Sequence, residues 1–73
     1  MITNNFNSEE VLWMADYADI DMIELEVSIY KSFPNAKEIT IDSIEPDIVF
    51  ILVDGEKYTI TPSGDEVWEG WEV

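Results

Sequence analysis

The 73-residue chain contains no cysteine, no histidine and no arginine. Without cysteine it can form neither a disulfide nor a thiolate metal site, and without histidine it lacks the commonest general base. The absence of arginine removes the bidentate anion clamp, and no glycine-rich loop matches a phosphate-binding pattern. A carboxylate pair could act as acid and base, but a chain this short seldom encloses the necessary cleft. We therefore expect no enzyme activity, no catalytic residues and no cofactor.

A long apolar run is also missing. The longest one, residues 48–53, is far shorter than the roughly 20 residues that a membrane-spanning helix requires. The N-terminus lacks the basic start and apolar stretch of a signal peptide. These features, with a cysteine-free composition that is compatible with a reducing compartment, predict a cytoplasmic protein.

A metal site is not expected either, although carboxylates are plentiful. Asp16, Asp19 and Asp21 form a D-x-x-D-x-D pattern, but an EF-hand loop also needs a glycine at its sixth position and a glutamate at its twelfth. This stretch has neither at the required spacing, and its acids suit helix caps. We predict no specific metal ligand.

Acidic residues dominate the charge. Seventeen acids against three lysines give a formal net charge of −14, beyond the magnitude of about 2 to 8 usual for a small soluble domain. Because phosphate contacts need cations, direct binding to nucleic acid is disfavoured. The excess favours a partner with a basic surface. The 47% hydrophobic content, with nine aromatics, predicts a packed core in one domain spanning residues 1–73.

The first helix is expected at about residues 8–18, after a loosely held lead of residues 1–6. Asn7 with Glu10 matches a capping box, and Phe6 with Val11 matches a hydrophobic staple. Apolar residues recur at helical spacing through the segment. The pattern therefore predicts a helix that begins directly after Asn7.

Residues 20–33 carry two competing periods. Met22, Leu25, Ile29 and Phe33 would share one face of a helix, which Asp21 would cap. Strict alternation from Ile23 to Ile29 instead matches a strand. The capping pattern and the following proline favour the helix. One long bent helix over about 8–33 remains an alternative, because neither glycine nor proline separates the two segments.

Residues 38–73 are expected to form a sheet. Alternation over 38–44, the apolar run 48–53 and alternation over 57–61 predict three strands, and 66–73 predict a fourth. Asp54-Gly55 is a strong hairpin signal. The predicted fold is α+β, with two N-terminal helices packed on a four-stranded antiparallel β-meander.

The apolar run poses a question, because only one of its two faces can meet the helices. Intramolecular cover is one alternative, and a homodimer or partner interface is the other.

The C-terminal tryptophans are also ambiguous. On a continuous strand Trp68 and Trp71 would lie on opposite faces, so both are not expected in the core. They are either interface residues or one core residue and one that covers a sheet edge.

The charge is best explained by occupation of a groove that normally holds nucleic acid. Carboxylates closely spaced on strands and helices offer a charge density comparable to that of phosphates. In size and charge the chain resembles the small acidic inhibitors that phages and mobile elements use, including anti-CRISPR and anti-restriction proteins. A structural or oligomerising domain is the alternative function. The predicted partner-binding residues are Asp16, Asp19, Glu38, Asp42, Asp54, Glu56, Asp65, Glu66, Trp68, Glu69, Trp71 and Glu72.

Overall fold

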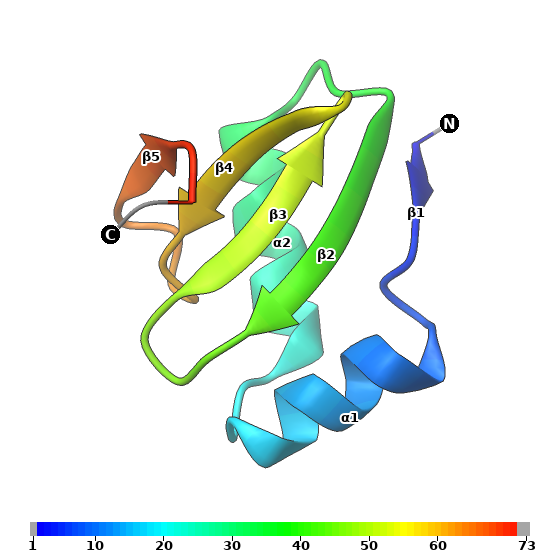
Figure 1. Ribbon diagram of the computed structural model, residues 1–73, viewed down its shortest axis with the longest axis vertical. Coiled ribbons are helices and arrows are strands. Elements are labelled where there is room, and N and C mark those ends of the chain that lie inside the picture. The colour runs from blue at the N-terminus through cyan, green and yellow to red at the C-terminus, as the bar shows by residue number, and fades with distance from the viewer. Residues whose placement is uncertain (1, 72–73) are drawn as a thin grey trace.

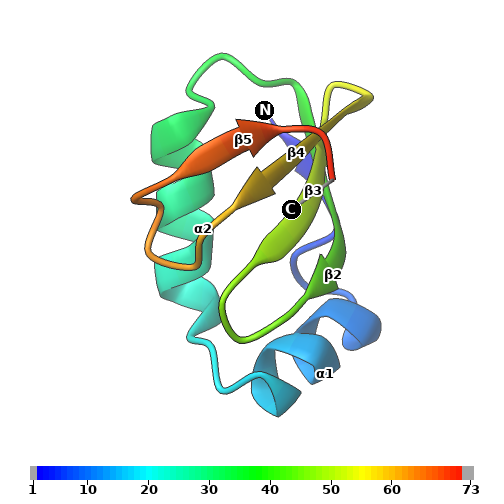
Figure 2. The same ribbon diagram turned by 60° about the vertical axis from the view of Figure 1, so that its left-hand side comes forward.

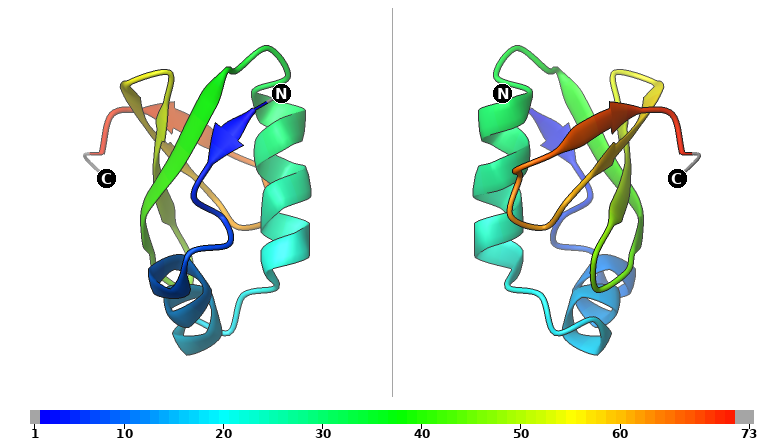
Figure 3. Two further views of the ribbon diagram at one scale, coloured as in Figure 1. Left: turned by 90° about the vertical axis from the view of Figure 1, so that its right-hand side faces the viewer. Right: turned by 90° about the vertical axis from the view of Figure 1, so that its left-hand side faces the viewer.

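The computed structural model describes residues 2–71 and has the predicted α+β architecture. Helix α2 lies along one face of a twisted sheet, and helix α1 crosses one end of it (Figures 1 and 3). The sheet order is β1-β2-β3-β4-β5, in which only β1 and β2 are parallel. The elements are β1 (Thr3–Asn4), α1 (Glu9–Tyr17), α2 (Met22–Ser32), β2 (Glu38–Ile44), β3 (Val49–Val53), β4 (Glu56–Ile60) and β5 (Val67–Glu69).

The N-terminal segment is not a loose lead, so that prediction is wrong for residues 3–6. Strand β1 pairs with the start of β2. The Asn5 side chain then continues the pairing, because its amide accepts from Ile41 N–H at 2.8 Å and donates to Ile41 C=O at 3.0 Å. Phe6 follows and is 1% exposed in the core. Asparagine is usually read as a turn residue, so its use as a substitute strand residue was not foreseen.

Helix α1 begins one residue later than the capping box implied. Ser8, not Asn7, is the N-cap, and its hydroxyl accepts from Val11 N–H at 3.3 Å. Phe6 and Val11 both lie in the core, although Phe6 is two residues before the actual cap. Glu9 and Glu10 occupy the first turn, where the helix dipole favours negative charge.

Two separate helices form, rather than one long bent helix. Asp19 ends α1 with a left-handed φ of 59°, the conformation usually taken there by glycine. Ile20 N–H donates to Ala15 C=O at 2.9 Å, and Asp19 N–H donates to Asp16 C=O at 3.1 Å. These two bonds make a Schellman motif. An aspartate can adopt this conformation, which explains why the helices separate without a glycine.

The second segment is a helix, as favoured by its capping pattern. Asp21 is the N-cap, and its carboxylate accepts from Ile23 N–H at 2.9 Å. Leu25 and Ile29 are fully buried, and Met22 and Phe33 pack beside them. Burial of this face against the sheet outweighs the β-branched alternation along residues 23–29.

The sheet buries the odd-numbered face of β3 under α2. Val49, Ile51 and Val53 are at most 7% exposed. The hairpin at Asp54-Gly55 forms as predicted, with positive φ at both residues. The pairing of β2 with β3 shifts register between Ile41 and Ser43, which leaves Asp42 as the extra residue of a bulge.

The opposite face of the sheet is covered in part by the chain itself. Strand β5 ends at Glu69, earlier than the predicted strand 66–73. Gly70, at φ 84°, turns the chain away from α2 (Figures 2 and 3). Trp71 then packs edge-on against Phe50, with ring centroids 6.2 Å apart, and its indole N–H donates to Ile51 C=O at 3.0 Å. A second molecule on this face stays a prediction.

No helix within residues 2–71 is long and apolar enough to cross a membrane.

Candidate functional site

The carboxylates form the outer layer of the molecule. Sixteen of the seventeen acids lie within residues 2–71; Glu26 is half-buried and the other fifteen are exposed. The core beneath them is apolar except for Thr59, whose hydroxyl donates to Gly70 C=O at 2.6 Å. The fold therefore holds a dense negative surface on a rigid apolar frame.

Three predicted site residues gather at the β3–β4 hairpin. Strand register brings Glu38 beside Asp54, whose N–H donates to Glu38 C=O at 2.8 Å, and Glu56 follows the turn. The Asp54 carboxylate also accepts from the backbone N–H groups of Lys37 and Glu38, at 2.9 and 2.8 Å. Asp54 therefore has a structural task that its sequence position did not indicate.

Tyr58 adds a hydroxyl to this hairpin end. Its ring packs against Phe33, with centroids 4.9 Å apart, and its hydroxyl donates to Glu56 at 3.2 Å. That hydrogen bond, some burial and the negative charges of Glu56 and Glu69 raise the pKa of Tyr58 above its usual value of 10.0. The raised pKa of Tyr58 therefore comes mainly from its hydrogen bond to Glu56, and the neighbouring negative charges contribute less.

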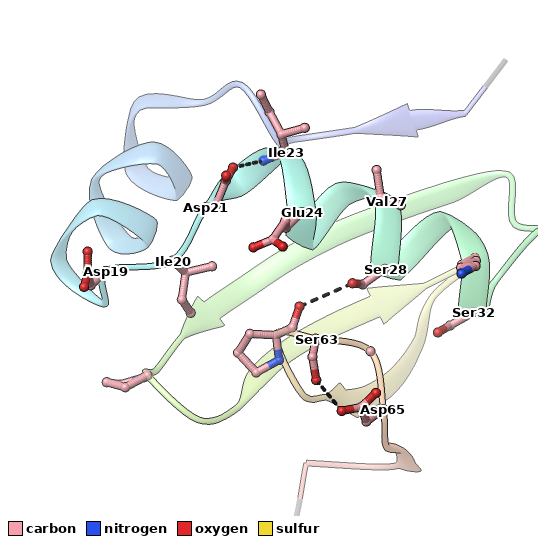
Figure 4. Close-up of a pocket in the computed structure, with 14 residues that line it drawn as sticks. Asp19, Ile20, Asp21, Ile23, Glu24, Val27, Ser28, Ser32, Ser63 and Asp65 are labelled. Atoms are coloured by element: carbon pink, nitrogen blue, oxygen red, sulfur yellow. Dashed lines mark hydrogen bonds between the residues drawn. The ribbon is translucent and has the colours of Figure 1, made fainter.

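A second group of acids surrounds an open groove between α2 and the β4–β5 turn (Figure 4). The groove has a volume of about 900 Å³. Ser28 donates to Pro62 C=O at 3.3 Å within it, and a side chain at Gly64 would collide with Ser28. The acids that line it are Asp19, Asp21, Glu24 and Asp65, with Lys31 as the one cation among its lining residues.

Only Asp19 and Asp65 of the predicted set belong to this groove. Asp21 and Glu24 line it as well, and Asp21 is at the same time the N-cap of α2. Glu24 is exposed, so its position at the helix start does not prevent it from facing a partner. Ile23 and Val27, also lining residues, are 73% and 57% exposed and provide apolar contact area beside the acids.

The remaining predicted acids are dispersed. Asp16 lies near the end of α1, Asp42 at the β2 bulge, Glu66 just before β5 and Glu69 at its end. All four are exposed. Glu72 lies outside the described residues. The predicted set therefore forms several acidic areas around the molecule.

The two C-terminal tryptophans lie on the same face of the sheet, so the prediction of opposite faces is wrong. Cross-strand pairing aligns Trp68 with Thr59 and Thr59 with Phe50, on the face away from α2. Gly70 interrupts the alternation and returns Trp71 to that face. Trp68 is 37% exposed, whereas Trp71 is partly buried and lies 4.9 Å from Lys57 Nζ.

The sequence interpretation missed the most exposed aromatic pair, on α1. Trp13 is 67% exposed and Tyr17 is 84% exposed, and their rings stack with centroids 5.7 Å apart and an interplanar angle of 20°. The signal was present in the sequence. Trp13 and Tyr17 are four residues apart, on the side of the helix away from the buried Val11, Ala15 and Ala18.

Within the described part of the chain, no group of three or more histidine, cysteine, aspartate or glutamate residues is placed to hold a metal ion. The carboxylates of the D-x-x-D-x-D stretch are divided between the end of α1 and the cap of α2.

Comparisons of the chain with models of protein families, with curated proteins and with solved structures found no match.

Proposed function

We propose that this chain is a non-enzymatic inhibitor that binds a basic, nucleic-acid-binding protein. Its carboxylates would occupy the positions on that protein where nucleic-acid phosphates bind. The observation that carries the proposal is the placement of fifteen exposed carboxylates on one folded frame, against three lysines in the whole chain. A disordered acidic tail would lose conformational entropy on binding, whereas this surface is already ordered. The phage anti-CRISPR and anti-restriction inhibitors, acting in the cytoplasm, are the class in which we place it.

Electrostatics sets the expected behaviour of such an inhibitor. A surface of one sign steers an oppositely charged partner and accelerates association, and salt weakens that attraction. The groove acids and the hairpin-end acids form two separate acidic groups, and the exposed apolar side chains of Ile23 and Val27 line the groove. Charge would therefore govern the association rate, while apolar contact would slow release.

The test is capture from a bacterial lysate on the immobilised protein, at about 50 mM and about 500 mM salt. We expect capture of DNA- or RNA-binding proteins at low salt, release at high salt, and release by a duplex of about 20 base pairs. The captured protein should also lose DNA or RNA binding when the chain is added. Capture that is indifferent to both salt and competing nucleic acid would overturn the proposal.

Matched variants show which acidic area meets the partner. Glu24→Gln with Asp65→Asn removes two groove charges, and Glu38→Gln with Glu56→Gln removes two hairpin-end charges, with little change in shape. The pair that faces the partner should weaken binding more and reduce its salt dependence. Equal small effects from both pairs would indicate a diffuse charge effect without a defined docking surface.

A further inference from the structure

The outward side of α1 has no structural task that the described contacts reveal, yet it carries the two most exposed aromatic rings in the protein's described part. Val11 and Ala15 bury the inner side of this helix. Trp13 and Tyr17 stack on each other and remain 67% and 84% exposed. Contiguous exposed apolar patches rimmed by polar residues mark interaction sites, and tryptophan and tyrosine are enriched among the residues that dominate binding energy.

Carboxylates surround this aromatic pair. Glu9 and Glu10 precede Trp13 by four and three residues, and Asp16 follows it by three, so all three are its neighbours on the helix surface. All three are exposed, and the last turn of α1 has no basic residue. We call this surface, Glu9, Glu10, Trp13, Asp16 and Tyr17, the α1 ridge.

We propose that the α1 ridge binds an arginine side chain of the basic partner, with the guanidinium stacked on Trp13 or Tyr17 and held by the neighbouring carboxylates. This inference rests on the proposed function and names the surface and side chain that it uses. A guanidinium is planar and weakly hydrated, so it stacks on an aromatic ring while donating to carboxylates alongside. Charge complementarity selects this occupant, because the ridge presents three carboxylates and no cation.

The protein already contains a contact of this kind. Lys57 Nζ lies 4.9 Å from the centroid of the Trp71 ring, on the outer face of the sheet. That pair is intramolecular, so Trp71 is not available to a partner in the way that Trp13 is. Asp19, a groove residue at the end of α1 (Figure 4), follows the ridge residue Tyr17 by two positions in the sequence.

A second copy of this chain is a poorer occupant of the ridge. Each copy carries a formal charge of −14, and the ridge of each would bring its own carboxylates to the contact. Like charges placed opposite one another oppose association. Self-association is therefore an outcome that the test must be able to detect.

The test is an NMR titration of ¹⁵N-labelled full-length chain with octa-arginine at low salt, followed on backbone amides and tryptophan indole N–H groups. We expect the largest shifts at α1 and at the Trp13 indole, and weaker binding of octa-lysine. Trp13→Ala should weaken octa-arginine binding about fivefold. Val67→Ala is the control, an exposed apolar side chain on β5 beside Glu66 and outside both the ridge and the groove, and it should leave the affinity unchanged.

Several results would overturn the inference. Shifts spread evenly over all acidic segments, or equal weakening by Trp13→Ala and Val67→Ala, would show binding without a ridge site. A dimer in light scattering that Trp13→Ala dissolves would assign the ridge to self-association. Lysate capture that salt and DNA reverse but Trp13→Ala leaves unchanged would remove the ridge and keep the proposed function. If the ridge binds octa-arginine but no nucleic-acid-binding protein is captured, the ridge site is kept and the proposed function is lost.

Discussion

Trp71 and Trp13 have the same side chain, but the fold packs the first against the sheet and leaves the second exposed. Trp71 lies on the sheet, where it donates to Ile51 C=O and packs against Phe50. Trp13 lies on α1, stacks only on Tyr17 among aromatic rings and stays 67% exposed. Both come from acid-rich segments, so composition does not separate them. What separates them is whether a distant part of the chain supplies a partner.

The difference shows how this small protein divides its surface. A chain of this length buries only about 60% of the area that its unfolded form exposes, so each additional buried ring matters. Trp71 is used to cover the second face of the central strand β3. Trp13 contributes no comparable cover, and its large apolar area therefore remains free for intermolecular contact.

Trp71→Ala is expected to have the largest effect on stability, which would sharpen the contrast between Trp71 and Trp13. We expect the free energy of unfolding to fall by about 3 kcal/mol, because the variant loses ring contact with Phe50 and a hydrogen bond to the central strand. Urea unfolding followed by circular dichroism measures it. Trp71→Phe keeps part of the ring contact and removes the N–H donor, so its loss should be smaller.

Trp13→Ala is the variant to compare with Trp71→Ala. Its free energy of unfolding should stay within about 0.5 kcal/mol of the wild type, since the side chain is exposed and alanine is a good helix former. If Trp13→Ala proved as destabilising as Trp71→Ala, the ridge would have a structural role and the contrast would fail.

The next largest effect on stability is expected at the N-terminal segment, where Asn5 depends on a distant partner as Trp71 does. Asn5→Ala should lower the free energy of unfolding by about 2 kcal/mol, because the N–H and C=O of Ile41 would both lose the Asn5 amide. Asn7→Ala is the matched control, since Ser8 is the residue that caps α1, and it should stay within about 0.5 kcal/mol. Equal losses from both variants would contradict the structural role given to Asn5.

These examples show how far the sequence could lead. Local patterns correctly predicted α1, α2 and the Asp54-Gly55 hairpin, because each depends on neighbours in the chain. They left open which face of the apolar run 48–53 meets the helices. Strand β1 and the Trp71 contact were not predicted. Both depend on partners more than 15 residues away, which periodicity does not report.

The candidate site was predicted less well for the same reason. Single-residue exposure was foreseeable for the acids, but their grouping was not. The groove joins Asp19 to Asp65 across the fold, and Asp54 proved to hold two backbone N–H groups. Trp13 could have been found from helical spacing alone, because its side of α1 is opposite to Val11.

Asp19 tests whether the end of α1 is shaped for stability or for binding. Asp19→Gly should raise the free energy of unfolding by about 0.5 kcal/mol, because glycine suits the left-handed φ and the carboxylate opposes the helix dipole there. Asp19→Asn, which keeps a side chain that tolerates this conformation, separates the charge effect from the backbone effect. A stabilised variant with weaker partner binding would show that the carboxylate serves the interface.

Tyr58 is intermediate between the two tryptophans, since its half-buried ring packs on Phe33 while its hydroxyl reaches Glu56. Its raised pKa means that the folded state holds the phenol proton more tightly than the unfolded state, whose pKa is 10.0. The resulting stabilisation is present in full below about pH 10 and is lost as the pH rises through the folded pKa. Tyr58→Phe and Glu56→Gln should therefore both lose less stability than the wild type between about pH 9 and about pH 11, measured as urea midpoints. Identical alkaline losses in all three proteins would show that the Tyr58–Glu56 contact does not couple to folding.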